Sequence, residues 1–121
     1  MVVTNIAITA IKTSVITDFT TNISHTAVGD DATTPTESDT TLTNETYIDA
    51  LFSESSLSDR YIANMFLDIT ENNSNTILEY GLFTSASGGD MYIHSLTNSI
   101  TKTSDVEAFI ESQINIKIGN L

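Results

Sequence analysis

Apolar residues recur every three or four positions near the start of the chain, which predicts an amphipathic helix over residues 4–23. Thr4 or Asn5 is suited to begin it, because a short polar side chain can accept a hydrogen bond from an amide of the first turn. The many β-branched residues lower helix propensity, so we expect this helix to need a surface to pack against. The predicted apolar stripe comprises Ile8, Ile11, Val15, Phe19 and Ile23.

After this helix the pattern changes to that of short strands and turns. Residues 24–31, SHTAVGDD, predict a short strand that runs into a turn, since Gly29 and the two aspartates favour turns. Residues 32–45 are polar, contain Pro35 and predict an ordered surface loop. Residues 58–70 predict a strand, and ENNSN (71–75) predicts a hairpin turn after it. One face of that strand would carry Tyr61, Ala63, Met65, Leu67 and Ile69.

Two further segments are predicted to be extended. TILEYGLF and MYIHSLT are expected to pair as a hairpin around the loop SASGGD. Residues 105–118 are apolar at even positions, with only Ser112 interrupting, which predicts one strand of roughly 40 Å at about 3.3 Å per residue. We expect the end of so long a strand to reach another subunit.

These elements predict one domain, residues 1–121, of the α+β class. The N-terminal amphipathic helix (1–23) precedes a strand and polar loop (24–45). A mainly antiparallel β-sandwich or partly closed sheet (46–121) follows.

The charge balance is one-sided, with 4 lysines and arginines against 16 acidic residues and a formal net charge of −12. Such a surface repels phosphates and anionic lipids, so neither nucleic acid nor a membrane is an expected partner. Acidic, lysine-poor surfaces stay soluble at high ionic strength, so a saline habitat and an ordinary acidic surface both fit. The absence of cysteine excludes disulfides and thiolate metal sites.

Catalytic motifs are not evident. The only histidines, His25 and His94, stand in no HExxH spacing, and there is no GxSxG motif. No paired carboxylates at defined spacing stand out. We therefore expect neither an enzyme nor a cofactor.

Four acids near the polar loop could offer oxygen ligands to Ca²⁺. They do not follow the EF-hand pattern, and a solvated acidic loop is the simpler interpretation. These acids are Asp30, Asp31, Glu37 and Asp39.

The hairpin segment EYGLFTSASGGDMYIH begins with Glu79 and ends with His94. A hairpin would bring the two together, either as a catalytic pair or as polar ends of a structural hairpin. The spacing alone leaves both interpretations open.

Four segments, taken in order, are more informative than any one of them: HTAVGDD (25–31), TPTESDTTLTNETY (34–47), EYGLF (79–83) with SGGDMYI (87–93), and ITKTSD (100–105). They resemble the "iThiavGdG", "tPtpsdtaLgnEvy", "REiGLFd…sGgtLiar" and "itKtsdieltitwtiti" segments of tail-fibre and tail-collar fibre (baseplate-proximal) proteins of tailed viruses of bacteria and archaea. Together they span most of the chain.

This resemblance implies a structural protein of the virion, without catalysis. It would sit in the viral tail, at the baseplate or the proximal end of a tail fibre, and be extracellular after host lysis. Such proteins are usually homotrimers that contact other tail or baseplate proteins. The alternative is a host-surface adhesin that binds a glycan or surface protein directly, which predicts exposed aromatic side chains.

The resemblance also implies roles for individual residues. Glu45 and Glu79 would hold the loop to the sheet by pairing with arginines. Those arginine positions fall near Ile48, Leu78 and His94 here, so either backbone amides satisfy the glutamates or a protonated His94 pairs with one of them. The residues expected to serve structure and assembly are Ile8, Ile11, Val15, Phe19, Gly29, Pro35, Leu42, Glu45, Glu79, Gly81, Leu82, Phe83, Gly88, Gly89 and Lys102.

Overall fold

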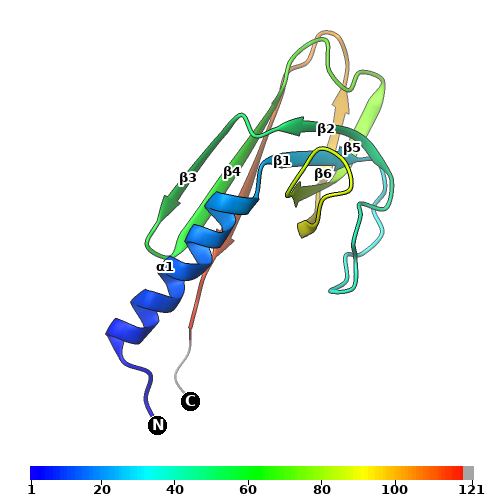
Figure 1. Cartoon of the computed structure of the whole chain (residues 1–121). Helices are drawn as coiled ribbons and strands as arrows, with labels where there is room; N and C mark the ends of the chain where they lie inside the picture. Colours follow the sequence, from blue (N-terminus) through cyan, green and yellow to red (C-terminus); the bar gives the residue numbers. More distant parts are fainter. Residues whose placement is uncertain (119–121) are drawn as a thin grey trace.

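The computed structural model describes residues 1–118, which form one helix followed by two antiparallel sheets (Figure 1). The first sheet has the strand order β2-β1-β5-β6 and the second the order β3-β4-β7. The expected α+β class is confirmed, although strands dominate and the two sheets do not close. The elements are α1 (Asn5–Asn22), β1 (His25–Gly29), β2 (Glu45–Ala50), β3 (Ser53–Leu57), β4 (Arg60–Leu67), β5 (Asn75–Phe83), β6 (Met91–Lys102) and β7 (Ala108–Asn115).

A helix forms where it was predicted and begins after Thr4, but its apolar residues are spread around it, so the predicted amphipathic character is wrong. The Thr4 hydroxyl accepts a hydrogen bond from the amide of Ala7 at 3.4 Å, so Thr4 rather than Asn5 is the N-cap. At the other end, the amide of Ile23 donates to the carbonyl of Phe19. Among residues 1–118, no helix is long and apolar enough to cross a membrane.

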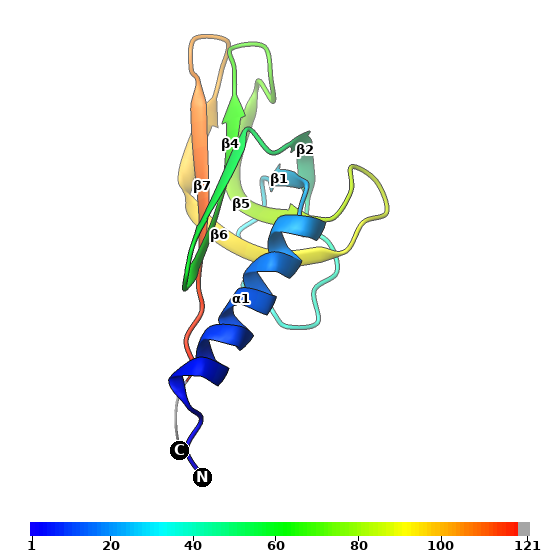
Figure 2. The same ribbon diagram turned by 60° about the vertical axis from the view of Figure 1, so that its left-hand side comes forward.

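The last turn of α1 packs on the sheets. Phe19 lies 5.6 Å from Tyr61 and 5.9 Å from Tyr92 between ring centroids, and Ile23 is buried. No residue within α1 is fully buried, and Ile11 of the predicted stripe remains 46% exposed. The N-terminal end of α1 lies beyond the turn that joins β3 to β4 (Figures 1 and 2).

The predicted strand at residues 24–31 is β1, the innermost strand of the first sheet together with β5. It is buried on both faces: Val28 packs with residues of the second sheet, whereas Ala27 packs with Leu42 of the polar loop.

Two strands were not predicted from the sequence, β2 beside β1 and the edge strand β3. Every residue of β3 is exposed, so its sequence SESSL carries no alternation of apolar and polar residues.

The strand predicted at residues 58–70 is confirmed as β4, whose alternate residues from Tyr61 to Leu67 are buried. Ile69, predicted on the same face, instead lies beyond the strand and is 49% exposed. The hairpin predicted at residues 71–75 is wrong. That segment turns the chain, but β4 pairs with β3 and β7 whereas β5 pairs with β1 and β6, so it carries the chain from one sheet to the other.

The long strand predicted at residues 105–118 is shorter in the structure. β7 runs only from Ala108 to Asn115, and Asn115 pairs with Arg60, the first residue of β4. Because pairing with β4 ends there, β7 does not extend past its sheet. The expectation that the end of this strand reaches another subunit rested on the greater length, which the structure does not show. The alternation itself is confirmed, since Ala108, Ile110 and Ser112 are buried.

Two of the three apolar clusters lie between the sheets. One surrounds Val28 and Met65, and the other joins Ile23 and Leu82 to the inner face of β4. The third cluster lies on the opposite face of the first sheet, under the loop that connects β1 to β2. The first sheet is thus covered on one face by the second sheet and on the other face by this loop.

Replacing Leu82 with alanine should lower the free energy of unfolding by about 2–5 kcal/mol, because its side chain is fully buried between the sheets. Leu57→Ala is the matched control, since Leu57 is 55% exposed and its loss should cost only about 0.5 kcal/mol. Urea unfolding followed by circular dichroism measures both. Equal losses in the two variants would contradict this assignment of the core.

Candidate functional site

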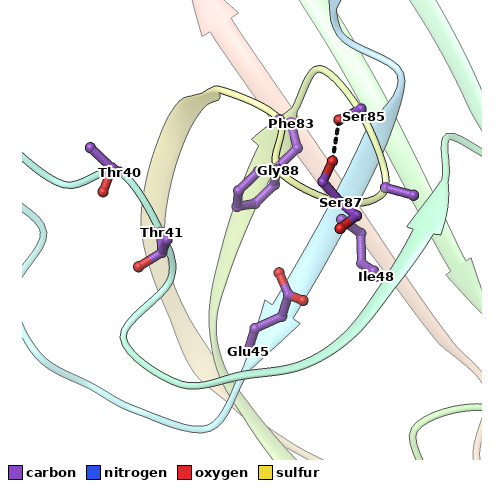
Figure 3. A pocket seen from close by; sticks show the side chains of 10 residues that line it. Thr40, Thr41, Glu45, Ile48, Phe83, Ser85, Ser87 and Gly88 are labelled. Carbon is purple, nitrogen blue, oxygen red and sulfur yellow. Dashed lines mark hydrogen bonds between the residues drawn. The ribbon is translucent and has the colours of Figure 1, made fainter.

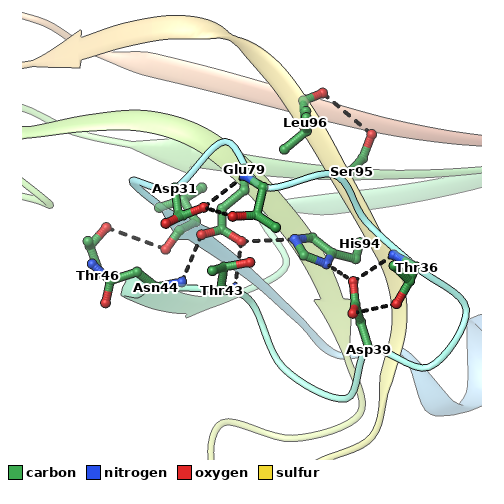
Figure 4. A network of polar contacts seen from close by, with 12 residues as sticks. Asp31, Thr36, Asp39, Thr43, Asn44, Thr46, Glu79, His94, Ser95 and Leu96 are labelled. Carbon is green, nitrogen blue, oxygen red and sulfur yellow. Dashed lines mark hydrogen bonds and ion pairs between the residues drawn. The ribbon is translucent and has the colours of Figure 1, made fainter.

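The loop of residues 30–44 covers the face of the first sheet that points away from the second sheet. Leu42 anchors it by packing with Ala27 and Phe83, and its own relative exposure is only 4%. Gly81 permits this contact: a Cβ at that position would lie 3.0 Å from a methyl carbon of Leu42 and 2.8 Å from the carbonyl oxygen of Ile93. Apolar packing thus fixes the middle of the face, and polar contacts beside it complete the attachment (Figure 4).

The carboxylate of Glu79 is the centre of those polar contacts. Glu79 is fully buried on β5, where its Oε1 accepts from the amide of Thr43 at 2.8 Å and its Oε2 from the amide of Asn44 at 2.9 Å. Gly29 lies opposite Glu79 in the β1–β5 register. A Cβ at Gly29 would come within 2.6 Å of Oε2, so glycine at this position leaves room for the carboxylate.

His94 connects Glu79 to a second carboxylate, that of Asp39. Its Nε2 lies 2.9 Å from Oε1 of Glu79, and its Nδ1 lies 2.7 Å from Oδ2 of Asp39. His94 pairs with Gly81 across the β5–β6 ladder, which places its ring diagonally beside Glu79 on the same face. The three side chains are 0%, 5% and 26% exposed in the order Glu79, His94 and Asp39, so the connection is mostly shielded from water.

The geometry determines where protons are needed. Two ionised carboxylates can only accept hydrogen bonds, so both ring nitrogens of His94 must carry hydrogen to satisfy them. A protonated imidazolium meets this need, whereas a neutral ring can donate to only one carboxylate. The ring of His94 therefore lies between two acceptors, one from the sheet and one from the loop.

Asp39 stays ionised throughout the range in which a histidine titrates. The backbone amide and hydroxyl of Thr36 donate to its carboxylate, and with the further contact from His94 they hold its pKa below the ordinary value. Asp39 therefore keeps its negative charge near neutrality and remains an acceptor for the ring of His94.

This group is better suited to holding the loop than to catalysis. Both ring nitrogens of His94 are occupied by carboxylates, which leaves neither free to take a proton from a substrate. For the hairpin that begins with Glu79 and ends with His94, the contacts support the structural interpretation. Both backbone amides and the ring of His94 contact the carboxylate of Glu79.

Glu45 does not join this group. It lies at the start of β2, beside the tip of the β5–β6 hairpin with Phe83, Gly88 and Gly89 (Figure 3). Among residues 1–118 its carboxylate has no hydrogen bond or ion pair, so neither expected partner reaches it. Asp39, and not Glu45, supplies the second carboxylate of the group. Its contact with His94 joins residues 55 positions apart, and no local sequence pattern indicates it.

The four acids considered as calcium ligands are held separately. Asp39 binds Thr36 and His94, Asp31 binds Thr33, and Asp30 accepts from the side chain of Asn44. Glu37 is exposed. Within residues 1–118, no group of three or more His, Cys, Asp or Glu side chains is placed to hold a metal ion.

Two further residues that were expected to serve structure and assembly, Lys102 and Pro35, lie away from this group. Lys102, at the end of β6, is fully buried and donates to Oδ1 of Asn73 at 2.8 Å and to the carbonyl of Thr103 at 3.0 Å. It thereby fixes the segment that crosses between the sheets. Pro35 is half-buried within the loop of residues 30–44.

No family model matches this chain, and no curated protein is significantly similar to it.

Glu79→Gln should lower the free energy of unfolding by about 3–5 kcal/mol, because the change removes the charge that two amides and His94 surround in a buried site. Glu37→Gln makes the same change at an exposed position of the loop and should cost about 0.5 kcal/mol or less. Chemical unfolding of both variants tests this. A loss for Glu79→Gln no larger than that of its control would rule out the anchoring role.

His94→Ala should lower the free energy of unfolding by about 1–3 kcal/mol. The change removes the ring that contacts both the buried carboxylate of Glu79 and the carboxylate of Asp39.

The matched control is His25→Ala, because His25 is the other histidine and its side chain contacts the hydroxyl of Ser24. Urea unfolding compares the three proteins. A loss for His94→Ala no larger than that for His25→Ala would contradict the role of His94 in holding the loop.

Proposed function

We propose that the protein is a structural component of a viral tail, either a tail fibre or a baseplate connector. It would act in tail assembly and host attachment through protein–protein contacts, as a homotrimer located in the tail of the virion. The proposal includes no catalytic step and no cofactor.

The observation that carries the proposal is the way the resembling segments lie in space. Residues 25–29 form β1, which pairs with β5 from residue 79 to residue 83, and β5 pairs with β6 at residues 91–96. The loop of residues 34–44 lies across them and is held by Glu79 and His94. Segments that are far apart in the sequence thus form one unit, which supports interpreting their order as a single inherited module.

The exposed apolar surface of α1 supports a role in assembly. Ile6 is 85% exposed and Ile11 46% exposed, on a helix whose N-terminal end lies beyond the turn between β3 and β4. Exposed aliphatic side chains on such a helix are suited to packing against a second chain.

A second apolar surface lies on the outer face of the second sheet. Phe66 and Phe109 are a cross-strand pair of β4 and β7, and Phe52 lies 5.4 Å from Phe66 and 6.3 Å from Phe109 between ring centroids. Phe52 and Phe109 are 63% and 54% exposed. Interfaces are enriched in aromatic side chains at their centres, so this phenylalanine cluster also supports protein contacts.

The same phenylalanine cluster favours the second candidate function, a host-surface adhesin. Exposed aromatic rings are what direct binding of a glycan or surface protein requires. Binding of host cells by the isolated protein, lost in Phe109→Ala, would favour the adhesin.

Light scattering coupled to size exclusion, in low salt and in molar salt, tests self-association. A mass near three times 13.1 kDa is expected, favoured by the salt that screens the charge of −12. Ile11→Asp should shift the protein toward the monomer by placing a charge on the exposed apolar face of α1. Thr13→Asp adds the same charge at an exposed position of the same helix and should keep the parent mass. A monomer in both buffers would contradict the homotrimer.

A further inference from the structure

A hollow of about 270 Å³ opens beside the tip of the β5–β6 hairpin. The loop before β2 forms one wall through Thr40 and Thr41, and the hairpin tip forms another through Ser85 and Ser87. Figure 3 shows the carboxylate of Glu45 between these walls, with Phe83 beside it.

The residues that line the hollow combine three chemical characters. The four threonines and serines offer hydroxyl oxygens that accept hydrogen bonds. Phe83 and Ile48 add apolar surface, and Glu45 is the only charged side chain. The lip is open at Gly88, where φ is +67° and an added Cβ would have no atom within 4 Å.

The carboxylate of Glu45 lies at the exposed edge of the hollow and receives no hydrogen bond within residues 1–118. Partial loss of hydration beside the hollow raises its pKa above the ordinary value. The carboxylate is therefore free to accept hydrogen bonds from a cation that enters the hollow.

That cation has to come from another molecule. The chain has only four lysines and arginines, and none of them lines the hollow. Lys102 is committed to Asn73 and Thr103, and Arg60 lies on β4 in the other sheet.

We propose that the hollow is a binding site for a guanidinium group, supplied by an arginine side chain of a partner protein. A planar guanidinium can direct two N–H groups at the two oxygens of Glu45 and its remaining N–H groups at the surrounding hydroxyls. Its weakly hydrated face can lie against Phe83 and Ile48. An ammonium group is a compact, strongly hydrated charge and would leave the apolar wall unused.

The identity of the partner as a protein of the same assembly rests on the proposed function. The guanidinium site itself does not, because it follows from the contacts of this chain alone. A monomeric protein with a functioning site would therefore reject the trimer and keep the inference.

The site is tested by titrating the ¹⁵N-labelled full chain with N-acetyl-arginine amide and following the backbone amide signals. The expected result is saturable shifts in the millimolar range, confined to residues 40–48 and 83–89. N-acetyl-lysine amide carries the same charge and should bind several-fold more weakly. Glucose serves as an uncharged, hydroxyl-bearing probe and should produce no saturable shift.

Two variants separate the site from a general attraction of cations to an acidic protein. Glu45→Gln should weaken binding of the arginine probe by about tenfold or more. Glu107→Gln removes the same charge at an exposed position outside the hollow and should leave binding unchanged. Thr41→Val keeps the size of the side chain, removes one hydroxyl and should weaken binding to a smaller extent.

Several results would overturn the inference. These are the absence of saturation, equal binding of the lysine probe, or binding that survives Glu45→Gln as well as it survives Glu107→Gln. Saturable binding of glucose in the same hollow would also overturn it, and would move the assignment toward a glycan. The amide spectrum of each variant shows directly whether it is folded.

Discussion

A carboxylate buried without water needs hydrogen-bond donors on every side, and Glu79 obtains them from parts of the chain that are far apart. Two amides come from the loop before β2, and a ring nitrogen comes from β6. None of these donors is in place until the loop lies on the sheet and the β5–β6 hairpin has its register. The requirement to satisfy one charge therefore couples the loop, the central strands and the hairpin into a single cooperative arrangement.

The loop that satisfies Glu79 also replaces a layer of secondary structure. A sheet with apolar residues on both faces needs two covers, and here the second cover is an irregular segment that contains one buried leucine. Apolar contact alone from Leu42 would leave the loop free to shift. The directional bonds to Glu79, together with the Thr36–Asp39–His94 contacts, determine its position.

Much of the fold could be predicted from the sequence wherever a periodic pattern and a buried face coincide, as in β4 and β7. The prediction failed where the alternation of apolar and polar residues continues beyond the paired strand. The alternation runs to residue 118, but β7 ends at Asn115, which pairs with the first residue of β4, Arg60. It also failed at residues 71–75, since a turn that joins two sheets has the same local sequence as a hairpin. β3 is exposed throughout, so no hydrophobic signal marks it.

The site was predictable only in part. Glu79 and His94 stand out because they end two apolar runs that a hairpin brings together. Asp39 was noticed as an acid of the loop, but its contact with His94 depends on the path of an irregular segment that no periodicity describes. Glu45 was expected to hold the loop as Glu79 does, yet it lies at the start of β2, beside the tip of the β5–β6 hairpin.

The attachment of α1 has a mechanical consequence. The helix has 18 residues, which corresponds to about 27 Å of length, and it is fastened to the body at its last turn through Phe19 and Ile23. A rotation of about 10° at the Phe19–Tyr61 contact would move the far end of a helix of this length by about 5 Å. A force applied near the N-terminus would in turn be concentrated on that aromatic contact and on the end of the sheets next to it.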